Sequence, residues 1–439
     1  MNISKKLQVK VLGKVVGTLA QSSDRPAHVF SYLPDAPQTH FVSLLMPVRA
    51  ESYVWKEGLH PFFQMNLPEG APKDILRQRL GPSMPVDDFH LLELTGTSGI
   101  GRVEVSAWGG DTARTNLKIN IEGVLAHTDS RAALLETLDE LDVHQMGISG
   151  VMPKASLAPN AKLTVKTGSA ILKTGREDTP GIAINEFLCM GLAAQMGLPV
   201  PDVELSDDGN VLAVRRFDRD SIDGTPLGLE DFCALLALSP TDKYRPSMES
   251  VAAQLRRFCA ESNIVSSSKS LISMLVLNLV VRNADAHAKN YALLYTSAQD
   301  AILAPVYDVV TVHAYQKFAN STFGLSIGGN KGWNLRKQLD RFCLERLNLP
   351  LSTVSDAVEL AAAGMQKLLP EIERYANGFP QFRDTGKRMV KLWQAGLQAT
   401  AGNQVTSVLV DFSAAKLSDE QRRTKIRKVM YTMNRTKIM

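Results

Sequence analysis

The sequence predicts an α+β fold in three parts: a β-rich N-terminal module, a small lobe of strands with one helix, and a large helical lobe. Three observations support this division. Apolar residues alternate with a period of two in stretches of residues 1 to about 125. Two hairpin patterns then flank one apolar helical segment between residues 126 and 214. From residue 215 to residue 439 the apolar period becomes helical, with one strand pair inside it.

The N-terminal module contains three strand-like stretches, "LQVKVLGKVVGTLA", "HFVSLLMP" and "GIGRVEVSAW". The first has a glycine near its centre, where a turn is expected. A helix is expected within "PFFQMNLPEGAPKDILRQRL", with Pro72 in its first turn, because that turn leaves its N–H groups unbonded and proline has none. We place the end of this module near residue 125.

The small lobe, residues 126–214, contains "AKLTVKTGSAILK", which predicts a hairpin around Gly168 and Ser169. The segment "TPGIAINEFLCMGLAAQMG" predicts a helix, with Pro180 in its first turn and Gly197 at its C-terminal cap. A second hairpin is expected in "VELSDDGNVLAVRRFDR", with its turn at residues 208–210. This order predicts a small strand-plus-helix lobe.

Helical periods fill the large lobe, at about residues 230–238, 248–261, 267–282, 333–348, 352–376 and 380–400. One strand pair, "NYALLYT" with "AILAPVYD", interrupts them. The longest apolar run, Leu271–Val281, has about 11 residues and is too short to span a membrane. No membrane association is therefore expected.

The composition indicates a globular protein, with 44% hydrophobic and 21% charged residues. Net charge is 49 − 45 = +4, which alone is too weak to indicate nucleic-acid binding. The four cysteines form no CxxC pair, and no histidine stands at ligand spacing to them. Together with the lack of a signal-peptide pattern at the start, this predicts reduced core thiols in a cytoplasmic protein. The cysteines are Cys189, Cys233, Cys259 and Cys343.

A polar cluster follows the longest apolar run directly. The stretch "NADAHAKN" places Asp285, His287, Lys289 and Asn290 within six residues. Asp285 can accept a proton from a hydroxyl, and the amide oxygen of Asn290 can bind Mg²⁺, which prefers oxygen ligands. Asp308 lies 23 residues beyond Asp285, across the predicted hairpin, and can share the metal. The D-x4-N … D spacing is that of phosphoryl-transfer sites.

Lys289 is expected either to reach a transferred phosphoryl group or to be an exposed loop lysine, and His287 to position or pack rather than act as a base. Glu186 is the only charged residue in "GIAINEFLCMGLAAQM". A carboxylate on so apolar a helix needs a partner, and Lys173 at the end of "AILK" is the predicted one. Such a pair would hold the lysine toward the α- and β-phosphates of ATP.

A loop that covers the phosphates is also expected. The candidate is "GISGVMPKAS", which contains Gly150 and Lys154 and precedes a strand. Backbone N–H groups of such a loop can bind phosphate oxygens. This indication is weak by itself, because a Gly-Ser turn with a proline is common in loops.

Together these residues resemble the HipA family, the serine/threonine kinase toxins of bacterial type II toxin–antitoxin modules. "NADAHAKN" and "LAPVYDVV" resemble the family's catalytic loop and metal-binding segment. "HPFFQMNLPEG", "SGVMPK", "LAVRRFDR" and "LSIGG" match further family motifs. The resemblance implies a protein-kinase-like two-lobe fold with an extra N-terminal β-rich module and a large, essentially all-helical C-terminal lobe.

Carried over residue by residue, the resemblance implies roles for the site residues. Asp285 becomes the catalytic base, Asn290 and Asp308 the Mg²⁺ ligands, and Lys173 the ATP lysine. The segment "VRRFD" resembles the hinge between the lobes, with backbone groups near Arg215 and Phe217 meeting adenine.

The resemblance also implies an activity and partners. The activity is ATP-dependent phosphorylation of protein serine or threonine, and family targets are aminoacyl-tRNA synthetases, whose modification halts translation and favours persistence. The implied partner is a small helix-turn-helix antitoxin, HipB-like, that represses the operon with the toxin. Operator DNA would be reached only through that antitoxin.

The sequence departs from the family pattern at three positions. The loop reads Gly147-Ile148-Ser149 where members often carry a serine first, so autophosphorylation is expected on Ser149. Two added negative charges beside Lys154 are expected to disorder the loop and silence the kinase. Met152 also stands where glutamine is common. Arg215 stands where members often carry an acid, which would remove a side-chain contact to adenine.

Two other functions stay open. The chain can act mainly as a co-repressor with its antitoxin, its basic tail touching DNA. The tail "SDEQRRTKIRKVMYTMNRTKIM" has seven basic residues after Glu420, and it equally fits a solvated basic helix. A small-molecule phosphotransferase would use the same D-x4-N … D chemistry.

Overall fold

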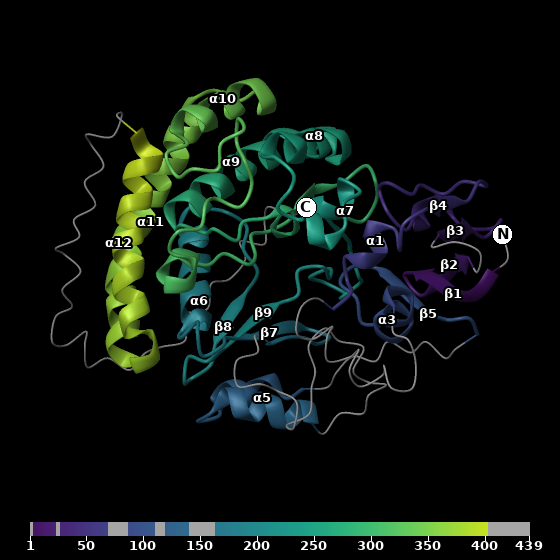
Figure 1. Ribbon diagram of the computed structural model, residues 1–439, viewed down its shortest axis with the longest axis horizontal. Coiled ribbons are helices and arrows are strands. Elements are labelled where there is room, and N and C mark those ends of the chain that lie inside the picture. The colour runs from purple at the N-terminus through teal and green to yellow at the C-terminus, as the bar shows by residue number, and fades with distance from the viewer. Residues whose placement is uncertain (1–2, 23–26, 69–86, 110–118, 140–162, 403–439) are drawn as a thin grey trace.

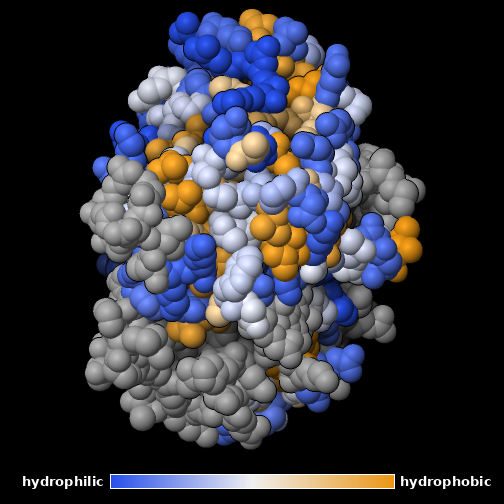
Figure 2. Space-filling model, turned by 90° about the vertical axis from the view of Figure 1, so that its right-hand side faces the viewer, coloured by the Kyte–Doolittle hydropathy of each residue, from blue (hydrophilic) through white to orange (hydrophobic). Residues whose placement is uncertain are grey.

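The computed structural model describes residues 3–22, 27–68, 87–109, 119–139 and 163–402. The N-terminal module lies at one end of the molecule and the long helices α11 (Ser352–Gly378) and α12 (Arg383–Ala401) lie at the other, with the small lobe between them (Figure 1). On the face at the N-terminal end, hydrophobic residues form separate patches among hydrophilic ones (Figure 2). Such a mixture is ordinary for a water-exposed surface. The predicted α+β architecture is confirmed.

The N-terminal module forms, within its described residues, a five-stranded antiparallel sheet in the order β4-β3-β2-β1-β5. The strands are β1 (Ile3–Val11), β2 (Lys14–Ser22), β3 (His28–Tyr32), β4 (Tyr53–Trp55) and β5 (Val103–Ala107). Leu12 and Gly13 both have positive φ, as the tight β1–β2 turn requires. The helices α1 (Pro61–Gln64) and α3 (Asp88–Thr95) contribute Phe63 and Phe89 to the core beneath the sheet.

The prediction of a strand in "HFVSLLMP" is wrong. A short 3₁₀ helix, Gln38–His40, leads into this segment, which then turns at Ser43 instead of pairing along the sheet. The reason is a buried contact with the large lobe. Glu230 accepts hydrogen bonds from the Ser43 hydroxyl at 2.6 Å, the Leu44 N–H at 2.7 Å and the Tyr295 hydroxyl at 2.6 Å.

The small lobe contains, among the described residues, a four-stranded antiparallel sheet in the order β6-β7-β9-β8. Its strands are β6 (Leu163–Lys166), β7 (Ala170–Thr174), β8 (Val203–Leu205) and β9 (Val211–Arg215). Both predicted hairpins are therefore confirmed. Along β9, Leu212 and Val214 pack with α6 (Ile182–Gln195), whereas Val211 and Ala213 face the other side. There they meet α4 (Ile121–Ala126) and α5 (Ser130–Asp139), so both faces of the sheet are covered.

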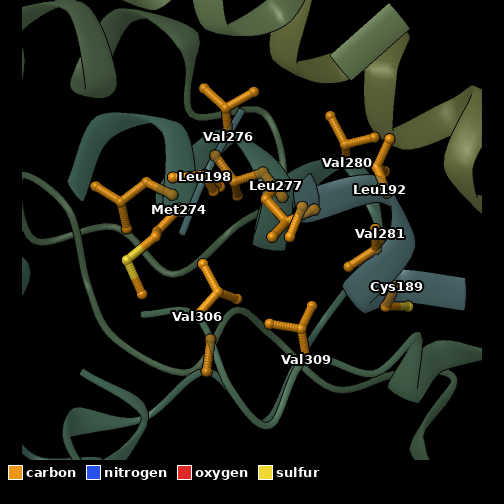
Figure 3. Close-up of a cluster of buried hydrophobic side chains, with 14 of the residues drawn as sticks. Cys189, Leu192, Leu198, Met274, Val276, Leu277, Val280, Val281, Val306 and Val309 are labelled. Carbon is orange, nitrogen blue, oxygen red and sulfur yellow. The ribbon is translucent and has the colours of Figure 1, made fainter. Parts of the chain in front are cut away.

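The large lobe is built around α9. Its helices are α7 (Phe232–Leu235), α8 (Met248–Phe258), α9 (Ile264–Val280), α10 (Arg336–Leu347), α11 (Ser352–Gly378) and α12 (Arg383–Ala401). Side chains of α9, α6 and the segment 306–309 form one buried cluster (Figure 3). Residues Glu261–Val280 are long and apolar enough to cross a membrane, but 61% of an apolar 18-residue stretch within them is buried inside the protein, as in a core helix.

A small sheet also lies in the large lobe. Among the described residues it has three antiparallel strands, β10 (Gly228–Asp231), β11 (Ala292–Tyr295) and β12 (Ile302–Leu303). The β11–β12 hairpin is the predicted strand pair, and β10 adds a third strand. All four cysteines are free, three of them buried, in agreement with reduced core thiols.

Candidate active site

The polar loop of residues 284–290 is fixed to the end of α9. Asn283 donates from its backbone N–H to the Asn278 carbonyl at 2.9 Å and from its side chain to the Asn278 amide oxygen at 2.7 Å. Arg282 takes a φ of 57°, which ends the helix and turns the chain. Asn278, near the C-terminus of the apolar helix, therefore accepts the hydrogen bonds that fix the start of the loop. These two hydrogen bonds attach the polar loop to the end of α9.

Asp285 is exposed although the residues on both sides of it are buried. The side chain of Asp285 is 52% exposed, whereas Ala284, Ala286 and His287 are buried. The Tyr244 hydroxyl donates to Asp285 Oδ1. A carboxylate presented in this way can receive a proton from a hydroxyl group brought from outside.

His287 is held in its neutral form. Burial, with a smaller contribution from the charge of Lys243, lowers the pKa of His287 to about 4. Its Nε2 lies 3.9 Å from Asp285 Oδ1, beyond hydrogen-bond distance. The ring also packs edge-on against Tyr244, with 5.1 Å between centroids. This arrangement supports the expectation that His287 positions and packs.

The loop and hairpin bring Asn290 and Asp308 to the same region. The His287 N–H donates to the Asn290 side-chain oxygen at 3.0 Å, which fixes the orientation of that amide. The Tyr307 hydroxyl donates to the Lys289 carbonyl at 2.8 Å. Tyr307 directly precedes Asp308 and Lys289 directly precedes Asn290, so this bond links the two segments. Asp308 takes a φ of 56°, an unusual backbone conformation that is often found at functional sites.

Lys173 stands between two carboxylates. It lies 2.5 Å from Glu186 Oε1 and forms a second ion pair with Asp308. The predicted Lys173–Glu186 pair is present, and the contact with Asp308 joins the small lobe to the large one. Burial alone would lower the pKa of Lys173, but the charges of Asp308 and Glu186 outweigh it and raise that pKa above its ordinary value. The lysine is therefore cationic where phosphate groups would need it.

The other predicted residues lie at different places. Lys289 is half-buried, and its ammonium group lies 3.4 Å from the Met65 carbonyl of the N-terminal module. Arg215 is exposed at the end of β9, and its N–H donates to the Asp202 carbonyl at 2.8 Å. The Phe217 ring packs against Tyr307, 5.6 Å between centroids. Their contacts with a nucleotide stay predictions. Ser149, Gly150 and Lys154 lie outside the described residues.

The residues present fit ATP with Mg²⁺. Within the described ranges, no group of three or more His, Cys, Asp and Glu side chains is arranged to hold a metal ion. Mg²⁺ bound with a nucleotide needs none, because phosphate oxygens and water complete its coordination around one or two protein oxygens. The carboxylate of Asp308, 44% exposed, and the oriented amide oxygen of Asn290 are donors of that kind. Lys173 is a cation in contact with Asp308.

Tyr244, Tyr307 and Glu230 were not predicted from the sequence. Each contributes one hydroxyl or carboxylate to a contact between segments distant in the chain. Nothing in "PTDKYRP" distinguishes Tyr244 from an exposed loop tyrosine. Such roles become visible once the fold is known.

Comparison with protein families covers most of the chain. Residues 7–106 match the HipA N-terminal domain, and residues 146–373 match the HipA-like C-terminal domain. The second match spans more than half of the sequence and contains the polar loop, Lys173, Glu186 and Asp308.

Individual relatives agree with this. A candidate kinase of Sinorhizobium fredii is 31% identical over 328 residues, which cover 69% of this chain and 76% of the relative. The serine/threonine-protein kinase toxin HipA of Shewanella oneidensis is 27% identical over 334 residues, covering 69% of this chain and 74% of that protein. The solved complex of Shewanella oneidensis HipA, HipB and operator DNA contains a chain of the same fold. Its TM-score is 0.65 at 20% identity, over 90% of this chain and 96% of that chain. This chain therefore belongs to the HipA family of serine/threonine kinases.

Proposed function

We propose that this chain is the toxin of a toxin–antitoxin module, a protein kinase that uses ATP with Mg²⁺ to phosphorylate serine or threonine of a translation component such as an aminoacyl-tRNA synthetase. One observation carries the catalytic part of the proposal. Asp285 is exposed on an otherwise buried loop, while Lys173 bridges Glu186 and Asp308 across the two lobes. In this proposal Asp285 supplies the proton acceptor and Lys173 supplies the cation that binds phosphate.

In the proposed reaction the substrate hydroxyl gives its proton to the Asp285 carboxylate as its oxygen attacks the γ-phosphorus of ATP. The bond from that phosphorus to the bridging oxygen breaks, and ADP leaves. Lys173 holds the α- and β-phosphates, and Lys289 is the candidate to meet the transferred group. Asn290 and Asp308 would hold Mg²⁺, which neutralises phosphate charge. These residues would align the reacting groups and neutralise phosphate charge, the two things that phosphoryl transfer chiefly needs.

We also propose a role for each of three parts of the chain. Residues 1–125 form the N-terminal module, residues 126–214 the small lobe that holds ATP, and residues 215–439 the lobe that holds the catalytic loop. Adenine would meet the segment around Arg215 and Phe217. Autophosphorylation on Ser149 would silence the kinase, because its charges would lie beside Lys154.

The proposed partner is a small helix-turn-helix antitoxin. The family relationship supports this, since the structurally similar Shewanella HipA is found in a complex with HipB and operator DNA. In our proposal DNA is reached through the antitoxin, and the complex is cytoplasmic. The basic tail after Glu420 is an additional candidate for a DNA or acidic-protein contact.

The proposal is tested by incubating the chain with γ-labelled ATP, Mg²⁺ and a bacterial cell extract, wild type beside Asp285→Asn. We expect labelled serine or threonine in an extract protein with the wild type, and loss of at least about 10³-fold in transfer with Asp285→Asn. Binding of ATP should persist in the variant, because the substituted carboxylate is not a proposed nucleotide contact. Undiminished transfer by Asp285→Asn would remove the assigned base. A chelator should also stop the wild-type reaction.

A further inference from the structure

The segment of residues 239–247, between α7 and α8, lies against the catalytic loop. The Ala288 N–H donates to the Lys243 carbonyl at 3.0 Å. One residue further, the Tyr244 carbonyl accepts a hydrogen bond from the Lys331 ammonium group at 3.0 Å. The backbone on both sides of the Tyr244 α-carbon is thus fixed, once by the catalytic loop and once by Lys331.

The side chain of Tyr244 completes this arrangement. Its hydroxyl donates to Asp285 Oδ1, and its ring packs edge-on against His287. Asp285 is more than half exposed, so without this bond its carboxylate would be free to change rotamer. The phenol occupies one carboxylate oxygen and leaves Oδ2 for another donor.

The segment after Phe323 contacts both Lys331 and the catalytic loop. Lys331 also donates to the Gly324 carbonyl at 3.0 Å, so it links the backbone of Tyr244 to the segment that begins at Gly324. Gly324 packs directly on the catalytic loop, because a Cβ at this position would lie 2.4 Å from the Ala286 carbonyl oxygen. The motif "LSIGG", Leu325–Gly329, therefore continues a segment that must approach the loop without a side chain.

We propose that Tyr244 is a positioning residue for the catalytic carboxylate, held in place by Lys331. It fixes Asp285 through Oδ1 and so directs Oδ2 toward the substrate hydroxyl. The phenol keeps its proton throughout, and the substrate proton goes to Oδ2. This inference rests on the proposed role of Asp285 as the base. An orienting partner of a catalytic base is a recurring requirement of such sites.

The alternative is that Tyr244 occupies the place of the substrate hydroxyl and must leave before reaction. The two roles predict opposite results. A blocking phenol costs activity, so its removal would raise the rate, whereas an orienting phenol contributes to the rate. The anchored backbone on both sides of Tyr244 and the packed ring favour the orienting role.

The test is Tyr244→Phe, which removes one hydroxyl and keeps the ring on His287. In the extract assay with γ-labelled ATP and Mg²⁺, we expect the rate at saturating ATP to fall about tenfold or more. The KM for ATP and the melting temperature should stay at wild-type values, a combination that loss of fold would not produce. Tyr53→Phe is the matched control, because it removes a phenol that donates to the Pro47 carbonyl in the N-terminal module. It should leave the rate unchanged.

A second variant, Lys331→Met, removes the support of Tyr244 without touching its hydroxyl. We expect a smaller fall in the same rate, again with an unchanged KM for ATP. A rate equal to or above wild type in Tyr244→Phe would overturn the inference. If Asp285→Asn is inactive in the same series while Tyr244→Phe is fully active, the proposed base stands and the positioning role fails. If Asp285→Asn is fully active, the proposed function itself fails.

Discussion

Glu230 and Asp285 are two acids of the large lobe in opposite environments. Glu230 is fully buried and accepts hydrogen bonds from Ser43, Leu44 and Tyr295. Asp285 is exposed, and within the described residues the hydrogen bond to its side chain comes from Tyr244. Both oxygens of the first carboxylate accept hydrogen bonds and water is excluded, and these bonds join the N-terminal module to the large lobe. The second keeps a free oxygen for chemistry.

This difference shows how to separate structural from reactive acids in one protein. A buried carboxylate is tolerated only when donors compensate for its lost hydration. Burial therefore raises the pKa of Glu230, and the Ser43, Tyr295 and Leu44 hydrogen bonds limit the rise. A carboxylate that acts on substrate must instead remain partly unsatisfied. On this account, substitutions around Glu230 change stability, and substitutions around Asp285 change the rate.

The largest stability effect is expected at Asp218, another buried acid of the structural kind. Burial alone would raise its pKa, but hydrogen bonds and charges from Arg216 and Arg219 lower that pKa below its ordinary value. Asp218→Ala leaves buried Arg216 without its partner and should lower the free energy of unfolding by about 3–5 kcal/mol. Urea denaturation measures it. Exposed Asp223→Ala is the control, and an equal loss in both variants would contradict the distinction.

The next effect concerns the charge that faces the phosphates. Lys173→Met should lower transfer about 100-fold, because a fixed cation no longer meets the nucleotide. The KM for ATP should rise, which separates this variant from Asp285→Asn. Exposed Lys337→Met on α10 is the matched control. Transfer at the wild-type rate in Lys173→Met would show that the bridge to Glu186 and Asp308 is structural only.

A pH effect follows from buried His287 and half-buried His60. Burial lowers the pKa of His287 and of His60 to about 4, from the ordinary value of 6.5. Between these values the unfolded chain binds protons that the folded chain does not. The free energy of unfolding is therefore highest above pH 6.5. It falls as the pH drops toward 4, by up to about 1.4 kcal/mol per pH unit for each histidine.

Denaturation curves at several pH values test this. His287→Gln and His60→Gln should each flatten the loss of stability between pH 6.5 and 4, whereas the exposed His127→Gln should not. An unchanged slope in both the His287 and the His60 variants would show that neither histidine carries the effect. Since His287 neighbours Asp285, its variant should be judged by stability rather than by rate.

The smallest effect is expected for one donor of the Glu230 cluster. Ser43→Ala removes one of the three hydrogen bonds to Glu230, and also the bond that the Ser43 hydroxyl accepts from the Leu45 N–H at 3.0 Å. The Leu44 and Tyr295 bonds to Glu230 remain. A loss of about 1 kcal/mol is expected in urea denaturation, with the transfer rate unchanged. Ser31→Ala, which removes a half-buried hydroxyl bonded to Ser52, should change stability by less. A fall in the transfer rate without a fall in stability would contradict a purely structural role for the hydrogen bonds around Glu230.

The sequence allowed much of the site to be predicted because its chemistry is local. Asp285, Asn290 and Asp308 stand at a characteristic spacing, and a lone glutamate on an apolar helix required a cation such as Lys173. The strands β3 and β4 and the docking of "HFVSLLMP" on Glu230 were missed, since they depend on contacts between distant segments. Tyr244 was missed for the same reason. Regular periodicity predicts elements, but it does not predict which exposed residue another segment will meet.

The most direct test makes the same chemical change, acid to amide, at the two carboxylates of the comparison. Asp285→Asn and Glu230→Gln are each measured for urea stability and for transfer of phosphate from labelled ATP. We predict that Asp285→Asn loses at least about 10³-fold in transfer and keeps wild-type stability. Glu230→Gln should lose about 1–3 kcal/mol of stability and keep transfer in its folded fraction. An Asp285→Asn variant that still transfers phosphate at the wild-type rate would contradict the account.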